Sequence, residues 1–500
     1  MKKIFASQVA VLDSNVYTGG GTDVTTALQA VLDQAVEGDG VHLVVDGAAL
    51  IHGLKVHSNT VIECTGRDCG FYMADYANRP MLTNSDWSYV EIRSRNITIQ
   101  GGTYNHNCRH QAHHVSTEEY PNPTDKVEPE YQEEHGVYMM EFYGMEDLAI
   151  RNVTFRNQRT YALTLGNFRN VLIERSTIEM ADHVHPSNQD GFHFFGPGQF
   201  LTMRDIRGCT GDDFINLGAD EFDGKSSITD VLIDGMILDG TCQGVRMLAK
   251  RDGRLDRVTV RNVTGTYRTF AFSIIPYWAG DTYGHYGDLF FENIDLRQIE
   301  ATYHYTPLTF FHAGGNIDCL TLKNVRFHMP VRNSLFLDFG RPFFYRPPEL
   351  TDEEMEFYGI VPESYLPPDW MPETARPHIR TLIVDGCTID CDEKFDGAEI
   401  IELRYRVDNC IVKNFQLFRS GSASVGGGLI RLCHEAQLGN LIVEDVFAEK
   451  LTHVISAGKG HSIGCLKCSN IFVKGSSEQL FAVDGAKIGH AAMTDVCKIG

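Results

Sequence analysis

A short pattern of apolar and polar residues recurs along the chain. Each copy has apolar residues at its first and third positions and a polar or charged residue at the fourth, and all copies but the one at Val171 have Asn, Asp or Gly at the fifth. The alternation predicts short strands that bury one side, and Asn or Asp suits a tight left-handed bend. The copies start at Ile97, Leu148, Val171, Leu201, Val231, Val258, Leu289, Leu320, Leu382, Cys410, Leu441 and Ile471.

The spacing of the copies points to a solenoid. Most steps span 23 to 31 residues, enough for three short strands with turns, which is one coil. A leucine-rich repeat would show regular leucines with helices between strands, and a β-propeller would need longer, four-stranded blades. We therefore expect residues 1–500 to form a single all-β domain, a right-handed parallel β-helix.

Two steps are too long for one coil and predict insertions at about residues 105–134 and 341–376. The first is rich in His, Glu and Pro. The second is rich in Pro and aromatic residues, and Thr351–Glu354 is expected to open a short helix within it. Such loops shape binding sites, and they equally decorate surfaces or join subunits. Near the start, an amphipathic pattern from Thr22 to about Gly38 predicts a helix that caps the open end of the solenoid.

Charge and composition narrow the function. A formal net charge of −22 argues against a nucleic-acid partner, because phosphate contacts need a basic face. No stretch of about 18 apolar residues occurs, so no membrane span is expected. The 13 cysteines are scattered, and only Cys465 and Cys468 form a C-x-x-C pair, which favours buried thiols in a reducing compartment. The N-terminus lacks a sufficient apolar segment for a signal peptide, so we expect a cytoplasmic location.

A second strand can be aligned in consecutive coils, with copies that begin at Tyr161, Asp190, Asp213, Gln243 and Phe270. This alignment stacks Phe192, Ile215 and Val245 inside. Successive rungs are about 4.7–4.9 Å apart, so the intervening residues form a polar ladder along one outer face, as a substrate groove requires. The ladder contains Thr164, His193, Asn216, Arg246 and Ser273.

Asp190 and Asp213 occupy equivalent positions on neighbouring rungs, and Asp212 adjoins the latter. Carboxylates this close repel one another, so one should keep its proton near neutral pH while another stays ionised. A proton donor beside a base is what cleavage of an acetal requires. Asp212 and Asp213 can act together only if the chain bends at Gly211. Otherwise the three aspartates only cap turns, as expected of Asp234.

These segments resemble a known family. Ser187–Gly191 and Gly211–Asp213 are similar to the Asn-x-Asp and Asp-Asp motifs of the polygalacturonase family, glycoside hydrolase family 28, and further similar segments are Thr22–Gln29, Gly38–Val45 and Ile97–Thr103. The resemblance implies a glycosidase in which Asp212 is the general acid, while Asp190 and Asp213 activate water for an inverting attack. The closeness of the rungs alone would suit a retaining pair, so the stereochemistry stays open.

Two features depart from the family pattern. Its Gly-His-Gly segment has no counterpart, and its Arg-Ile-Lys motif appears only as Arg246-Met247-Leu248. Arg246 can still bind a carboxylate with two hydrogen bonds, and Lys250 lies close in sequence, but loss of the motif's lysine puts a galacturonate subsite in doubt. His193 either supports the acids in place of the missing histidine or is structural.

Two further groups are candidates for ligand binding. Tyr277 and Trp278 lie in an aromatic run that suits stacking on a pyranose ring. A histidine-rich group has no recognisable metal-ligand spacing, so no metal or other cofactor is expected. It consists of His106, His110, His113, His114 and His135. The predicted substrate-binding residues are therefore His193, Asn216, Arg246, Lys250, Tyr277 and Trp278.

The favoured hypothesis is a polygalacturonase-like glycosidase, inverting and exo-acting on oligosaccharides that contain uronic acids or related sugars. A β-helix polysaccharide lyase is one alternative, and it would need calcium-binding carboxylates or an Arg or Lys base. A non-catalytic glycan-binding solenoid is the other. The sequence leaves the sugar, the linkage and the oligomeric state open, a homo-oligomer included.

Overall fold

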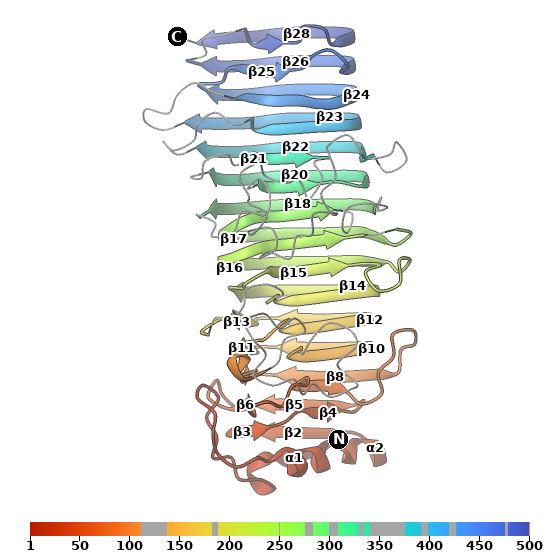
Figure 1. Ribbon diagram of the computed structural model, residues 1–500, viewed down its shortest axis with the longest axis vertical. Helices are drawn as coiled ribbons and strands as arrows, with labels where there is room; N and C mark the ends of the chain where they lie inside the picture. The colour runs from red at the N-terminus through yellow and green to blue at the C-terminus, as the bar shows by residue number, and fades with distance from the viewer. Residues whose placement is uncertain are drawn as a thin grey trace, which may run out of the picture. The chain divides into compact units, whose positions relative to one another are not determined.

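The computed structural model describes residues 1–111, 138–182, 189–249, 251–275, 284–299, 309–329, 335–340, 376–391, 399–419, 427–475 and 479–499. The chain forms two compact units, Met1–Gly218 with Ile228–Cys242, and Ala219–Ser227 with Gln243–Gly500. In each unit parallel strands stack as the rungs of a β-helix (Figure 1). The predicted all-β, right-handed parallel β-helix is confirmed, and the single domain stays a prediction.

The first unit holds both α-helices and most of the short strands. In chain order its elements are β1 (Lys2–Phe5), α1 (Thr25–Leu32), α2 (Gln34–Glu37), β2 (Val41–Val45), β3 (Ala48–Ile51), β4 (Leu54–Val56), β5 (Thr60–Cys64), β6 (Gly70–Met73), β7 (Leu82–Asn84), β8 (Ser94–Gln100), β9 (Thr103–Asn105), β10 (Met140–Arg151), β11 (Thr154–Arg156), β12 (Leu163–Glu174), β13 (Thr177–Glu179), β14 (Phe192–Gly208), β15 (Asp213–Gly218) and the first part of β16 (Ile228–Leu248).

The second unit is built of longer strands. After the end of β16 they are β17 (Arg254–Ile275), β18 (His285–Gln298), β19 (Thr309–Ala313), β20 (Asn316–Met329), β21 (Leu335–Phe339), β22 (His378–Cys391), β23 (Ile401–Arg419), β24 (Gly428–Glu449), β25 (His453–Ser456), β26 (Ser462–Lys474), β27 (Phe481–Ala482) and β28 (Lys487–Ile499).

The repeats of the sequence are in register in the structure. In the first unit the starting residues of successive copies pair from Ile97 to Val231, and in the second unit from Val258 to Leu441. The last copy was placed wrongly, because Leu441 pairs with Leu466 and not with Ile471. A second alternating apolar stretch follows Leu466 and imitates the pattern.

The fifth position of the repeat makes the bend that the sequence predicts. Asn152 and Asp205 have φ values of 55° and 51°, and Asn262 and Asn293 have values of 58° and 56°, the left-handed region that Asn and Asp tolerate. Neighbouring bends are linked in the second unit, where Asn293 Nδ2 donates to Asn262 Oδ1 at 3.2 Å. These short polar side chains therefore stabilise the turn in two ways. They tolerate its left-handed backbone, and their amides form hydrogen bonds between neighbouring turns.

Both predicted insertions interrupt the chain between adjacent rungs. Strand β8 pairs directly with β10, and β20 pairs directly with β22. Most of each insertion, the expected helix at Thr351–Glu354 included, lies outside the described residues.

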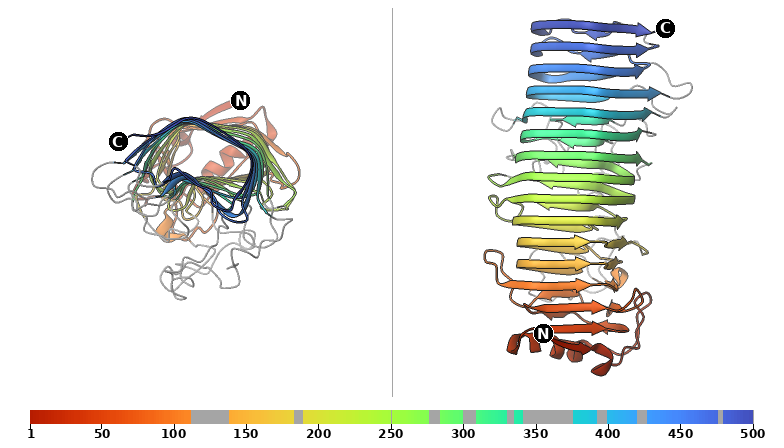
Figure 2. Two further views of the ribbon diagram at one scale, coloured as in Figure 1. Left: turned by 90° about the horizontal axis from the view of Figure 1, so that it is seen from above. Right: turned by 180° about the vertical axis from the view of Figure 1, so that it is seen from behind.

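The predicted N-terminal cap is confirmed. Asp23 Oδ1 accepts a hydrogen bond from the Thr25 amide at 2.9 Å at the start of α1, and Leu28, Val31 and Leu32 are at most 2% exposed. Helix α1 lies across the N-terminal end of the first unit (Figure 2). It covers core side chains that an open coil would expose. No helix in the described part of the chain has the length and apolarity to cross a bilayer.

The cysteines are free thiols, and many are buried as the sequence predicts. Burial raises the pKa of Cys64, Cys387 and Cys410 to about 12. These thiols stay protonated at neutral pH and pack as small apolar side chains.

Candidate active site

The strand register in the first unit brings two of the three acids together. Phe192 of β14 pairs with Ile215 of β15, so Asp190 and Asp213, two residues earlier, occupy equivalent positions on neighbouring rungs. The Gly191 amide donates to the Asp213 carbonyl at 2.8 Å. A Cβ at Gly191 would lie 2.5 Å from the Phe214 carbonyl oxygen. Glycine is thus required for the close approach that aligns the two aspartates.

The third carboxylate reaches the cluster through a bend. Asp212 lies in a bend just before β15, where its amide donates to the Gln189 carbonyl at 3.3 Å and its carbonyl accepts from Thr210 Oγ1 at 2.8 Å. One carboxylate oxygen from each of Asp190, Asp212 and Asp213 lies within 4.8 Å of the others. The predicted convergence is confirmed, and the bend explains why adjacent residues face the same place.

The three acids have different surroundings. Asp190 and Asp213 are 3% and 2% exposed, whereas Asp212 is half-buried. His193 Nδ1 lies 2.7 Å from Asp190 Oδ2, and Asn216 Nδ2 donates to Asp213 Oδ2 at 3.2 Å. Burial disfavours an ionised carboxylate, whereas hydrogen bonds to it favour the ionised form. The arrangement places two buried, hydrogen-bonded carboxylates beside a third that is more accessible.

The polar ladder predicted from sequence is in register in the first unit, but it does not line an open outer face as predicted, because Thr164, His193 and Asn216 are only 0%, 2% and 3% exposed. Thr164 pairs with His193, and His193 with Asn216, while Phe192 and Ile215 are fully buried in the core. His193 and Asn216 each follow the aspartate of their own rung by three residues, so the same polar contact is made on both rungs. His193 and Asn216 were predicted to bind substrate, and in the structure each contacts an acid of the cluster, where it supports that carboxylate.

Aromatic stacking holds His193 in place. Its ring lies parallel to Tyr161 at a centroid distance of 4.2 Å, and Tyr161 stacks on Tyr138 at 4.7 Å. Phe195 contacts the histidine ring at 4.5 Å. Sequence reasoning aligned Tyr161 with Asp190 but did not find the stack. The available signal was that Tyr138, Tyr161 and Asp190 each stand two residues before a core position paired in register.

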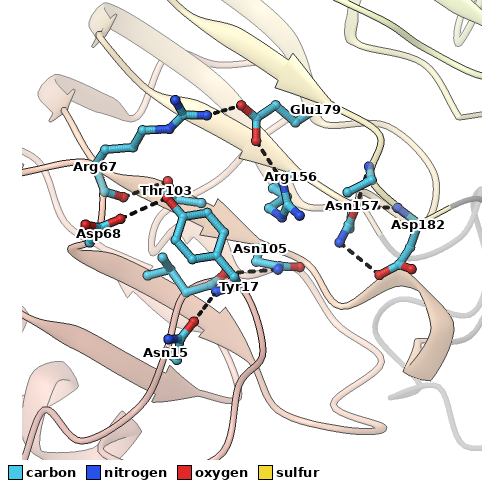
Figure 3. Close-up of polar contacts among 12 residues, drawn as sticks. Asn15, Tyr17, Arg67, Asp68, Thr103, Asn105, Arg156, Asn157, Glu179 and Asp182 are labelled. Carbon is cyan, nitrogen blue, oxygen red and sulfur yellow. Dashed lines mark hydrogen bonds and ion pairs between the residues drawn. The ribbon is translucent and has the colours of Figure 1, made fainter.

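The segment that leads from β13 toward Asp190 is anchored by polar contacts. Glu179 accepts hydrogen bonds from Arg67 and from Arg156, the latter at 2.8 Å. Asp182 accepts from Asn157 Nδ2 at 3.2 Å, and its amide donates back to Asn157 Oδ1 at 2.9 Å (Figure 3). The described chain stops at Asp182 and resumes at Gln189. These contacts hold Glu179 and Asp182 in place just before the chain continues toward Asp190.

The remaining predicted binding residues are not tested by the described structure. Arg246 lies in the part of β16 that belongs to the second unit and is half-buried. Lys250, Tyr277 and Trp278 lie outside the described residues. Their proposed contacts with substrate therefore stay predictions.

The second unit has a buried charged column that sequence reasoning missed. His312, Asp338 and Glu402 pair in register on three successive rungs, and Arg404 donates to Asp338 and to Glu402 at 2.5 Å each. Burial alone would lower the pKa of Arg404, but the two carboxylates outweigh it and raise the pKa. The acids of this column are thus compensated by a cation from their own unit.

The histidine-rich segment does not form a common site in the part that the structure describes. His106 is fully buried and accepts a hydrogen bond from the Arg159 amide at 3.2 Å, and burial lowers its pKa to about 3. His110 is exposed and pairs with Asp75 at 2.9 Å. His113, His114 and His135 lie outside the described residues.

A metal would find suitable ligands elsewhere. Among the described residues, the one group of His, Cys, Asp or Glu close enough to share a cation is Asp190, Asp212 and Asp213. Three carboxylates suit hard cations such as Ca²⁺ or Mg²⁺. The expectation of a metal-free site stays a prediction.

Comparison with known proteins supports the fold. No family model matches the sequence, and no curated protein is similar enough to match. The tailspike protein of Escherichia coli bacteriophage HK620, solved in complex with a pentasaccharide, is 13% identical, with a TM-score of 0.52 over 95% of this chain and 75% of the tailspike chain. At this identity the likeness shows a shared β-helix and nothing about activity.

Family 28 exopolygalacturonases are also among the similar structures. That of Yersinia enterocolitica is 12% identical, with a TM-score of 0.48 over 97% of this chain and 78% of its own. That of Thermotoga maritima is 11% identical, with a TM-score of 0.41 over 99% of this chain and 92% of its own. These scores are too low to carry an argument, so the resemblance to family 28 still rests on the motifs of the sequence.

Proposed function

We propose that this protein is a glycoside hydrolase, polygalacturonase-like, that cleaves glycosidic bonds with Asp190, Asp212 and Asp213. The observation that carries the proposal is the convergence of the three carboxylates, with their oxygens within 4.8 Å, in two kinds of environment. A donor and a base held together are the minimum equipment for hydrolysing an acetal.

The different environments support a proposed role for each acid. Asp212, the half-buried member, gives its proton to the glycosidic oxygen as the bond to the anomeric carbon breaks. Asp190 and Asp213, buried and hydrogen-bonded to His193 and Asn216, accept the proton of the attacking water. The products are a sugar with a new reducing end and the released alcohol, and Asp212 is reprotonated from solvent.

We further propose that the reaction inverts the anomeric carbon and removes units from the ends of oligosaccharides that contain uronic acids or related sugars. The motif resemblance supports inversion, whereas the short separation of the carboxylates is typical of retaining pairs. The configuration of the first-formed product decides between them. Arg246 and Lys250 supply the positive charge that a uronate carboxylate would need.

The variant Asp212→Asn tests this proposal. It removes the transferable proton at nearly constant volume, so kcat should fall by about 10²- to 10⁴-fold while saccharide binding, followed by calorimetry, is retained. Asp239→Asn is the matched control, because Asp239 is an exposed carboxylate of β16 in the same unit. Full activity in Asp212→Asn would refute the assignment.

Two alternatives have an observation in their favour. The tailspike of similar fold was solved in complex with a pentasaccharide, which favours glycan binding, and a role in binding alone predicts no new reducing ends. The other alternative is a lyase, and the observation in its favour is that the three carboxylates lie close enough together to share a cation. A lyase would release an unsaturated product that absorbs in the ultraviolet and would lose activity with a chelator.

A further inference from the structure

A second group of catalytic residue types lies beside the N-terminal cap of the first unit. Ser85 Oγ lies 2.7 Å from His57 Nδ1, and His57 Nε2 lies 2.9 Å from Asp33 Oδ1. Both distances are within hydrogen-bonding reach, and they connect a hydroxyl, an imidazole and a carboxylate in that order. This order is the diagnostic arrangement of an activated nucleophile.

The fold brings these residues together through register. Val56 of β4 pairs with Asn84 of β7, so His57 and Ser85, the next residues, leave neighbouring rungs at the same point. The Ser85 amide donates to the Val56 carbonyl at 2.9 Å. The hydroxyl and the imidazole are therefore held one rung apart by the backbone ladder.

Asp33 is held by the cap helix. It follows the last residue of α1, and Gln29 Nε2 donates to its Oδ1 at 2.8 Å. The Gln29 amide also contacts the backbone of Lys55, accepting from its N–H at 2.8 Å and donating to its carbonyl at 3.0 Å. Gln29 thus fixes the helix, and Asp33 with it, against the rung that carries His57.

The charges favour the proton positions that a nucleophile needs. Burial works to raise the pKa of Asp33, but hydrogen bonds from Gln29 and His57 outweigh it, and the pKa is lowered. An ionised Asp33 holds the imidazole proton on Nε2, which leaves the Nδ1 lone pair facing the Ser85 hydroxyl.

A surface cavity of about 560 Å³ lies over the three residues, and all three line it together with Lys55 and Arg79. The His57 side chain is 21% exposed. A volume of this order accommodates a small molecule. A contact that only docks α1 on the solenoid would need no opening above the serine.

We propose that Ser85, His57 and Asp33 form a second catalytic site, which hydrolyses esters of short-chain acids, an O-acylated sugar being one such substrate. Ser85 Oγ attacks the acyl carbon as His57 Nδ1 takes its proton, and the alcohol leaves with that proton. Water then attacks the acyl-serine with His57 as base, which releases the acid and restores the serine. The proposal does not depend on the acid cluster.

The test uses the full chain with a serine-directed fluorophosphonate probe and with p-nitrophenyl acetate. We expect the probe to label Ser85, and Ser85→Ala and His57→Gln to reduce ester hydrolysis by at least about 100-fold. Ser7→Ala is the matched control, because Ser7 bonds to a carboxylate, Asp46, at 2.5 Å. Thermal melting of each variant separates loss of activity from loss of fold.

Two results would overturn this second site. One is a folded wild-type protein that the probe does not label. The other is ester hydrolysis that survives in folded Ser85→Ala. The variant Asp212→Asn should keep the esterase activity in full, so failure of the glycosidase proposal and failure of this one are distinguishable.

Discussion

Replacing His193 by alanine should slow glycoside hydrolysis without unfolding the protein. The bond between His193 Nδ1 and Asp190 Oδ2 is 2.7 Å long, and both side chains are at most 4% exposed. A buried hydrogen bond to a charged group contributes about 1.5–3 kcal/mol. If that contribution holds the Asp190 carboxylate in place for the attacking water in the transition state, its loss lowers kcat by about 10- to 150-fold.

The companion variant His193→Asn separates positioning from packing. Its amide nitrogen reaches nearly the place of Nδ1, so it should restore a large part of kcat, while it still loses the stack on Tyr161, which lies 4.2 Å from the imidazole ring.

The assay is initial-rate kinetics on a uronic-acid oligosaccharide across the pH range, with thermal melting of each variant beside it. Folded His193→Ala with an unchanged kcat would refute the reasoning. Equal losses in His193→Ala and His193→Asn would show that the stack, and not the hydrogen bond, is what matters.

Three further predictions concern the same unit. Gly191→Ala should lower the free energy of unfolding by about 1–3 kcal/mol in urea titrations, because its Cβ would lie 2.5 Å from the Phe214 carbonyl oxygen; an unchanged midpoint would contradict this. Tyr161→Leu should lower the free energy of unfolding by about 0.5–1.5 kcal/mol through the lost stack on His193, and it should lower kcat more than it changes KM. Tyr161→Phe is the control that should keep both the stability and the kcat of the wild type. Burial lowers the pKa of His106 to about 3 in the folded protein, below the value of about 6.5 in the unfolded chain. Its contribution to stability is therefore complete above pH 6.5 and is lost as the pH falls toward 3. Unfolding titrations should find a shallower pH dependence of stability in His106→Asn, and an equal slope would argue against a buried neutral ring.

Periodicity made much of the fold predictable. Alternation and spacing fix where strands repeat, and Asn or Asp at the fifth position identifies the bends, as Asn152 and Asp205 show. The misplaced copy at Ile471 marks the limit of this reasoning. Two alternating apolar stretches in one coil look alike. Only the strand pairing tells them apart, since Leu441 pairs with Leu466 and Val446 pairs with Ile471.

The acid cluster was predictable because a solenoid turns sequence spacing into spatial proximity. Once Phe192 and Ile215 are aligned as core residues, Asp190 and Asp213 must lie one rung apart. The bend that brings Asp212 into the cluster could be stated only as a requirement from the sequence. It depends on hydrogen bonds with Gln189 and Thr210 that the sequence does not reveal.

Contacts between unlike elements were not predictable. The line from Ser85 through His57 to Asp33 joins two strand ends to the end of a helix, and no repeat relates a helix to the rungs it covers. The stack of Tyr138 and Tyr161 on His193 likewise depends on side-chain rotamers, which alternation of apolar and polar residues does not specify.

The most direct test of the central claim is an NMR time course of the wild-type protein with a panel of pectic and neutral oligosaccharides, run beside Asp190→Asn, Asp212→Asn and Asp213→Asn. The account predicts that the wild type releases a new reducing end of inverted configuration from at least one uronic-acid substrate, and that each folded variant releases almost none. Release at the wild-type rate by any of the three variants, or no release from any substrate by the wild type, would contradict it.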